Sequence, residues 1–196
     1  MRRREVKDQE TRTARHGEHG VTLRRTARVT IDGPSTDIDL ETWLFGLSDE
    51  EYQACARGHR AAGVFTDDRG RGSVNVEVIG GNLLIQHYRL VRGGRSHVEM
   101  FSDASRVYLL HLVPVAGTVR WTLTVTPTTE SSSAFTCTVE VGLHPVLMVL
   151  GHLMAVGTFL ARHVEEETRG FAADIGRKHR EQNVAAPGGH PGRLNA

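Results

Sequence analysis

The chain has 196 residues, which is long enough for one domain with a substantial buried core. Its 24 Lys and Arg residues nearly balance 23 Asp and Glu residues, so net charge gives no reason to expect a nucleic-acid partner. The two cysteines provide neither a disulfide framework nor a cysteine-based zinc finger, which favours a reducing, cytoplasmic location. Arginines 2–4 are not followed by an apolar run, so we predict no secretion signal.

The two ends of the chain differ in composition from its middle. Residues 1–20 are polar and lack apolar periodicity, and residues 181–196 are rich in glycine and proline. Segments of this kind bury too little apolar surface to fold. We therefore predict disordered tails at 1–20 and 181–196 around one domain at 21–180.

The first expected elements are a strand and a short helix. Residues 21–31 alternate loosely between apolar and polar, and the turn residues 32–35 end this strand. Ser48 and Glu51 have the spacing of a capping box, which predicts a helix that begins there and ends near Gly58. His59 lies just beyond the end of this helix.

A run of strands is expected next, with turns rich in glycine between several of them. The last two strands alternate regularly, as expected of a sheet with one buried and one exposed face. The predicted strands are 73–79, 83–91, 97–101, 106–115, 119–126 and 135–141.

A long helix from about Pro145 to Lys178 completes the domain. Its first part, residues 143–160, carries no charged side chain apart from two histidines. Proline, histidine and glycine interrupt this stretch, so a buried core helix is favoured over a membrane span. The predicted fold class is α+β: a curved antiparallel sheet wrapped around the C-terminal helix, with a ligand cavity between them.

One face of this helix combines apolar and ionisable side chains. Val156, Leu160, His163, Glu167 and Phe171 follow the helical repeat and share one stripe. A buried carboxylate is costly unless it is paired or binds a metal, and a His and a Glu one turn apart suit zinc. The alternatives are a core histidine hydrogen-bonded to Glu167, or a helix rotated so that Glu167 reaches solvent.

His59 and Glu77 are the two other candidate metal ligands. Val74, Val76 and Val78 form the apolar face of the strand that contains Glu77. Alternation therefore predicts that Glu77 lies on the wet face. It can face a cavity only if the valines are covered by other parts of the chain or by a second subunit, which leaves a homodimer open.

Three segments resemble the pattern of the diacetylphloroglucinol and phloretin hydrolases. They are Tyr52 with Gly58-His59, the stretch Val-Glu-Val-Ile-Gly-Gly-Asn-Leu-Leu at 76–84, and His-Val-Glu-Glu-Glu at 163–167. The resemblance covers about residues 39–178 and implies a Bet v 1-like, helix-grip fold. It also implies zinc bound by His59, Glu77, His163 and Glu167, and hydrolysis of a carbon–carbon bond beside a ketone on a phenolic ring.

Three further side chains are candidates for acid–base chemistry: His87, Tyr88 and His152. His87 and Tyr88 are neighbours on one strand, so at most one of them enters the cavity. His152 is eleven residues before His163, which places it on the same helix stripe. In this hypothesis the partner is an apolar or aromatic small molecule, with no membrane or nucleic acid involved.

Two other interpretations remain open at this point. The chain is equally similar to the broad polyketide cyclase and lipid-transfer superfamily of the same fold, which has no universal catalytic residue. A metal-free ligand carrier or cyclase is therefore the alternative function, with an apolar pocket and no bound metal. A structural dimer module that uses residues 143–160 as its interface would have no pocket of substrate size.

Overall fold

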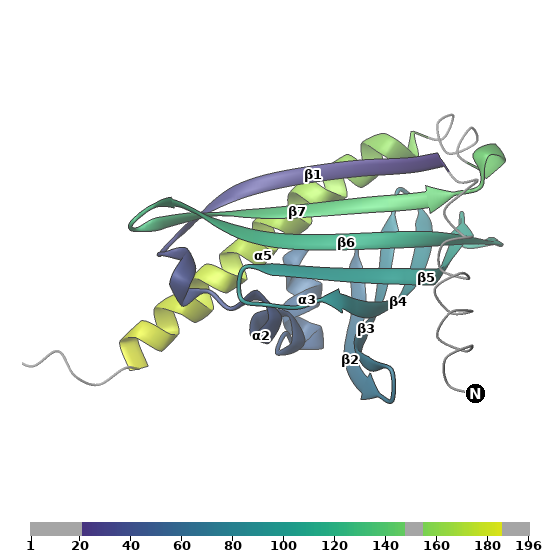
Figure 1. The fold of residues 1–196 in the computed structure, drawn as a ribbon. Helices are drawn as coiled ribbons and strands as arrows, with labels where there is room; N and C mark the ends of the chain where they lie inside the picture. Colours follow the sequence, from purple (N-terminus) through teal and green to yellow (C-terminus); the bar gives the residue numbers. More distant parts are fainter. Residues whose placement is uncertain (1–20, 148–154, 186–196) are drawn as a thin grey trace, which may run out of the picture.

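The structure is a computed structural model, and it describes residues 21–147 and 155–185. Its strands form one seven-stranded antiparallel sheet in the order β1-β7-β6-β5-β4-β3-β2 (Figure 1). The strands are β1 (Val21–Asp32), β2 (His59–Asp67), β3 (Gly70–Ile79), β4 (Asn82–Arg92), β5 (His97–Leu109), β6 (Val113–Thr129) and β7 (Ser132–Leu143).

Helical elements connect β1 to β2 and follow the sheet. The connection contains η1 (Ser35–Asp37), α2 (Leu40–Phe45) and α3 (Asp49–Cys55), and the predicted capping box of Ser48 and Glu51 starts α3. The long helix α5 (Val156–Ala185) runs diagonally across the sheet (Figure 1). It continues past the expected end at Lys178, so residues 181–185 of the predicted tail 181–196 are helical. Residues 1–20 and 186–196 of the two predicted tails lie outside the described residues.

The core lies between the inner face of the sheet and the helices. The buried stripe of α5 includes Leu160, Val164 and Phe171, and Phe171 packs against Trp43 and Trp121 at ring-centroid distances of 5.2 and 5.7 Å. Burial of these side chains is the main source of stability in such a layered domain. The predicted fold class, a curved antiparallel sheet that grips a C-terminal helix, is confirmed.

Several elements differ from the expectation. Helix α2 and the edge strand β2, residues 59–67, lie where no helix or strand was predicted. The stretch 106–115, expected to be one strand, turns back on itself between β5 and β6, with Leu110 and His111 at φ angles of 49° and 62°. Non-glycine residues are uncommon in this left-handed region, so no residue type in this stretch marks the turn in advance.

The inner face of β3 is the polar one. Ser73, Asn75 and Glu77 are buried, and the valines between them are half-buried on the outer face. There Val76 lies opposite Ala61 of β2 and Ile85 of β4. Cross-strand apolar pairs of this kind stabilise a sheet on its outer side, so the expectation that Glu77 would face solvent is wrong.

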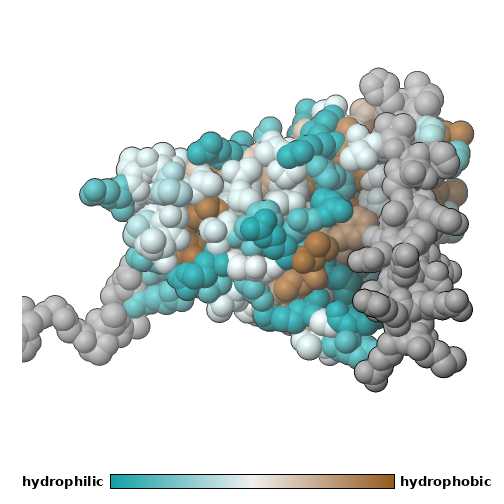
Figure 2. Space-filling view, viewed as in Figure 1, coloured by the Kyte–Doolittle hydropathy of each residue, from teal (hydrophilic) through white to brown (hydrophobic). Residues whose placement is uncertain are grey.

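The outside of the molecule is mixed in polarity. The face seen in Figure 2 is largely hydrophilic, with a few separate hydrophobic areas. Among the described residues, no helix combines the length and the apolar character needed to cross a bilayer.

Candidate metal centre

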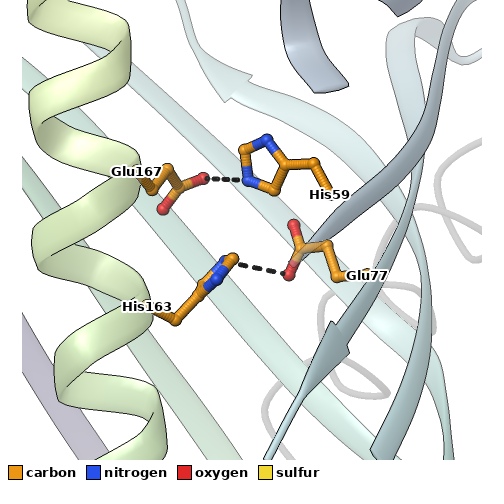
Figure 3. Close-up of side chains that lie close together, drawn as sticks. All are labelled: His59, Glu77, His163 and Glu167. Atoms are coloured by element: carbon orange, nitrogen blue, oxygen red, sulfur yellow. Dashed lines mark ion pairs between the residues drawn. The ribbon is translucent and has the colours of Figure 1, made fainter. Parts of the chain in front are cut away.

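Four buried side chains converge between the sheet and α5. They are His59 at the start of β2, Glu77 of β3, and His163 and Glu167 on α5 (Figure 3). One ligand atom from each lies within 4.8 Å of the others, and none of the four residues is more than 8% exposed. These are the four residues predicted from the sequence to bind a metal.

His59 is directed inward by the local backbone. It pairs with Glu77 across the strands, and a register shift follows before Ala61 pairs with Val76. A β-bulge of this kind re-aims a side chain at a strand end. The preceding Gly58 packs against His163, where an added Cβ would lie 2.8 Å from the ring Nδ1, so any larger residue would displace this candidate ligand.

Tyr52 of α3 fixes the orientation of two of the four side chains. Its backbone carbonyl lies 2.6 Å from Nδ1 of His59, and its ring stacks on the imidazole at 3.8 Å. A carbonyl can only accept, so Nδ1 carries a proton and the Nε2 of neutral His59 keeps its lone pair. The Tyr52 hydroxyl donates to Oε1 of Glu77 at 2.5 Å.

Two further side chains contact the carboxylates. Gln86 of β4 donates from Nε2 to Oε2 of Glu77 at 3.4 Å, and the Cys137 thiol of β7 donates to Oε2 of Glu167 at 3.6 Å. Sequence reasoning did not identify either role. The alternation of Leu84, Gln86 and Tyr88 on one strand face was the available signal for Gln86.

The helical period explains how α5 supplies the other two groups. His163 and Glu167 are one turn apart and both are buried, whereas Glu165 between them is exposed. This is the predicted arrangement of the stripe. The alternative in which His163 bonds to Glu167 is not observed, because His163 faces Glu77 and Glu167 faces His59.

The Nε2 atom of each histidine in the centre faces a carboxylate. Nε2 of His59 lies 3.7 Å from Glu167 Oε1, and Nε2 of His163 lies 3.5 Å from Glu77 Oε2. Burial alone would lower the pKa of His163, but the interaction with Glu77 and the charge of Glu167 outweigh it and raise this pKa to about 9. Burial alone would also lower the pKa of His59, but the interaction with Glu167 outweighs this effect and raises the pKa.

The same balance holds for the carboxylate of Glu77. Burial alone would raise its pKa, but the interaction with His163, the charge of His59 and the Tyr52 hydroxyl lower it. The centre therefore favours the ionised form of Glu77, which is the form that binds cations.

The nitrogen and oxygen atoms that the four side chains offer as metal ligands suit a divalent cation. Among the described residues, neither His59 Nε2 nor His163 Nε2 has a hydrogen-bond partner, although both are buried. The distances from these nitrogens to the facing carboxylate oxygens are longer than a normal hydrogen bond. They are close to the distance of about 3.4 Å between two atoms that each bind a tetrahedral zinc ion at ~2.1 Å. Nitrogen and oxygen donors of this kind suit zinc.

A narrow cavity adjoins three of the four side chains, because Glu77, His163 and Glu167 form part of its wall. Its unfilled space reaches about 330 Å³ only when the gaps between atoms and the part open to solvent are counted. The rest of the lining is mostly apolar: Ile79, Leu84, Gln86, Tyr88, Val119, Trp121, Val139, Val141 and Leu160.

The three predicted acid–base residues have different positions. Tyr88 is buried and lines the cavity. His87 is exposed and is not part of the lining, because neighbouring residues of β4 point to opposite faces. His152 lies outside the described residues.

The sequence matches no protein-family model and no curated protein, but solved structures share its fold. A conserved protein from Geobacillus kaustophilus has a TM-score of 0.55 at 10% identity, over 80% of this chain and 97% of that one. A point mutant of norcoclaurine synthase from Thalictrum flavum, in complex with a transition state analogue, has a TM-score of 0.52 at 14% identity, over 84% and 98%. TTHA0849 from Thermus thermophilus has a TM-score of 0.50 at 13% identity, over 83% and 99%. At these identities the likeness concerns the fold alone.

Proposed function

We propose that this protein is a metal-dependent hydrolase, with zinc as its metal, that cleaves a carbon–carbon bond beside a ketone on an aromatic, polyketide-like molecule. The observation that carries the proposal is the convergence of His59, Glu77, His163 and Glu167, the last three of which line a mostly apolar cavity. Removing two carboxylates and two imidazoles from water is costly, and a shared cation compensates that cost. The resemblance to the diacetylphloroglucinol and phloretin hydrolases at the same four residues adds support.

The roles of the residues follow from their positions. The four convergent side chains would hold the ion, which would lower the pKa of a bound water molecule and polarise a ketone oxygen. Val119, Trp121 and Val139 bind the aromatic ring and exclude bulk water from it. Tyr52 keeps His59 and Glu77 in the orientation that binding requires.

Tyr88 is the proposed proton donor. In the hydrolysis, the oxygen of water ends on the acyl fragment as a carboxylic acid, and the ring carbon that loses this fragment gains a proton. Burial, together with the charges of Glu77 and Glu167, raises the pKa of Tyr88 well above its ordinary value. Its hydroxyl therefore stays protonated at neutral pH and can supply that proton. His152 remains a predicted alternative for the role of proton donor.

The decisive experiment is elemental analysis of protein purified without a histidine tag. We expect about one zinc per chain in the wild type, and loss of it in His163→Ala and Glu167→Ala. Glu165→Ala, an exposed position on the same helix, is the matched control and should keep the metal. Circular dichroism verifies that each variant is folded, and hydrolysis of diacetylphloroglucinol and phloretin tests the reaction.

A metal-free ligand carrier or cyclase is the second candidate. It is favoured by the ability of the four groups to neutralise one another as two histidine–glutamate pairs. The norcoclaurine synthase structure, which holds a transition state analogue, also has this fold. A wild-type protein that is folded, binds an aromatic ligand and contains no metal would support this candidate and contradict the hydrolase.

A further inference from the structure

Gln86 is the polar exception among the side chains that line the cavity beside the four convergent groups. It is 3% exposed, lies on the inner face of β4, and has Leu84 and Tyr88 as its neighbours on that face. Asn75 faces it across the strands in the register of β3 and β4. The amide therefore sits in a wall that otherwise suits an aromatic ring.

The orientation of this amide follows from its contact with Glu77. A carboxylate only accepts, so the amide nitrogen has to face it, and the Nε2 to Oε2 distance is 3.4 Å. The amide oxygen is consequently turned away from the carboxylate. Oε1 is buried and has no hydrogen-bond partner within residues 21–147 and 155–185.

A buried carbonyl oxygen without a partner is unfavourable, and a ligand donor that reaches it relieves this cost. We propose that Gln86 is the specificity-determining residue of the cavity, and that its Oε1 accepts a hydrogen bond from a ring hydroxyl of the bound aromatic molecule. A hydroxyl-bearing aromatic ligand is thereby distinguished from an otherwise similar one that lacks the hydroxyl. Sites that hydrogen-bond a substrate hydroxyl reject analogues without it strongly, because their own polar group is then left unpaired.

The position of Gln86 also indicates where on the ligand this hydroxyl lies. The same oxygen of Glu77 is 3.4 Å from the Gln86 amide and 3.5 Å from His163 Nε2. The recognised hydroxyl is therefore close to whatever group of the ligand reaches the four convergent side chains. If that group is a ketone, which rests on the proposed function, the hydroxyl is on a ring carbon next to the ketone.

The test compares two probes and three proteins. The probes are an acetophenone with hydroxyl groups on both ring carbons next to the ketone, and acetophenone itself. Their Kd values are measured by titration calorimetry for the wild type, Gln86→Met and Leu84→Met. Methionine keeps the length of glutamine but has no amide oxygen, and Leu84→Met alters the same wall while leaving that oxygen in place.

We expect the wild type to bind the hydroxylated probe more tightly than acetophenone. Gln86→Met should reduce this preference about tenfold, as the loss of one buried hydrogen bond predicts, and Leu84→Met should retain it. A preference that persists in Gln86→Met overturns the proposal, and so does a wild type that binds neither probe or binds both equally.

Repeating the titrations in the presence of a chelator separates this inference from the proposed function. A preference that depends on Gln86 and survives removal of metal supports the role of Gln86 even if elemental analysis finds no zinc. Stoichiometric zinc in a protein without such a preference supports the hydrolase and contradicts the role of Gln86.

Discussion

Tyr52 makes three contacts with the candidate metal centre. Its ring stacks on His59, its carbonyl accepts from the same imidazole, and its hydroxyl donates to Glu77. Groups that hold metal ligands in place in this way commonly change metal affinity without contacting the ion. In this protein one such residue acts on ligands from two strands.

Replacing Tyr52 by phenylalanine isolates the hydroxyl from the other two contacts. The ring and the carbonyl stay, so His59 keeps its orientation while Glu77 loses a donor. We expect metal affinity to fall about 10–100-fold, measured by competition with a chromophoric chelator. Tyr88→Phe is the control, because this residue is also buried at the cavity but has no hydrogen bond to the four groups among the contacts of the described residues. Equal affinities for the wild type and Tyr52→Phe would contradict the positioning role.

The sequence reveals the helical half of the centre more readily than the strand half. The spacing of His163 and Glu167 within an apolar stripe determines their direction, since a helix buries one stripe. A strand has two faces, and alternation does not say which one meets the cavity. The three valines around Glu77 suggested the wrong face, because they lie on the outer side, where Ala61 and Ile85 are the apolar partners of Val76.

At the scale of elements, α5 passes very close to the end of α3 while it packs on the sheet. The backbone of Gly170 packs directly on Cys55, where an added Cβ would overlap the main chain. The helix is fixed at this point, three residues after Glu167. The contact therefore sets the depth at which His163 and Glu167 enter the core.

Gly170→Ala is predicted to lower the free energy of unfolding by about 1–3 kcal/mol, because main-chain atoms have to move apart. Gly176→Ala is the matched control on the same helix, since its Cβ would meet the nearest atoms at 3.4 and 3.8 Å. There alanine should stabilise the protein by up to about 1 kcal/mol through helix propensity. Urea unfolding of both variants measures the difference. If Gly170→Ala were as stable as Gly176→Ala, this close contact would not constrain the helix.

Local sequence patterns predicted the elements with strong periodicity. They did not predict the segments whose conformation depends on tertiary contacts. The long helix, the capping box and the hairpin around Gly80 follow from residue type and spacing. Strand β2 lacks clear alternation and owes its conformation to pairing with β3. The turn at Leu110 and His111 carries no turn residue, and a hydrogen bond from the Leu110 amide to Asn82 joins it to the neighbouring hairpin.

For the whole molecule, a metal bound between two strands and a helix would link binding to global stability. An ion that binds the folded chain alone stabilises it by about 4 kcal/mol when its free concentration is a thousand times Kd. We expect the thermal midpoint to rise with added zinc and to fall after treatment with a chelator. His163→Ala should show neither response. A midpoint that is the same with zinc and with chelator would contradict metal binding to the folded state.

The separation of the four donors along the chain has a consequence for biosynthesis. During translation the strands that carry His59 and Glu77 leave the ribosome well before α5, which brings the remaining donors and covers the sheet. An unfinished polypeptide offers an ion half a coordination sphere that is open to water. Complete metal binding would therefore require that α5 has been synthesised, so the bound ion would mark a chain whose translation has passed this helix.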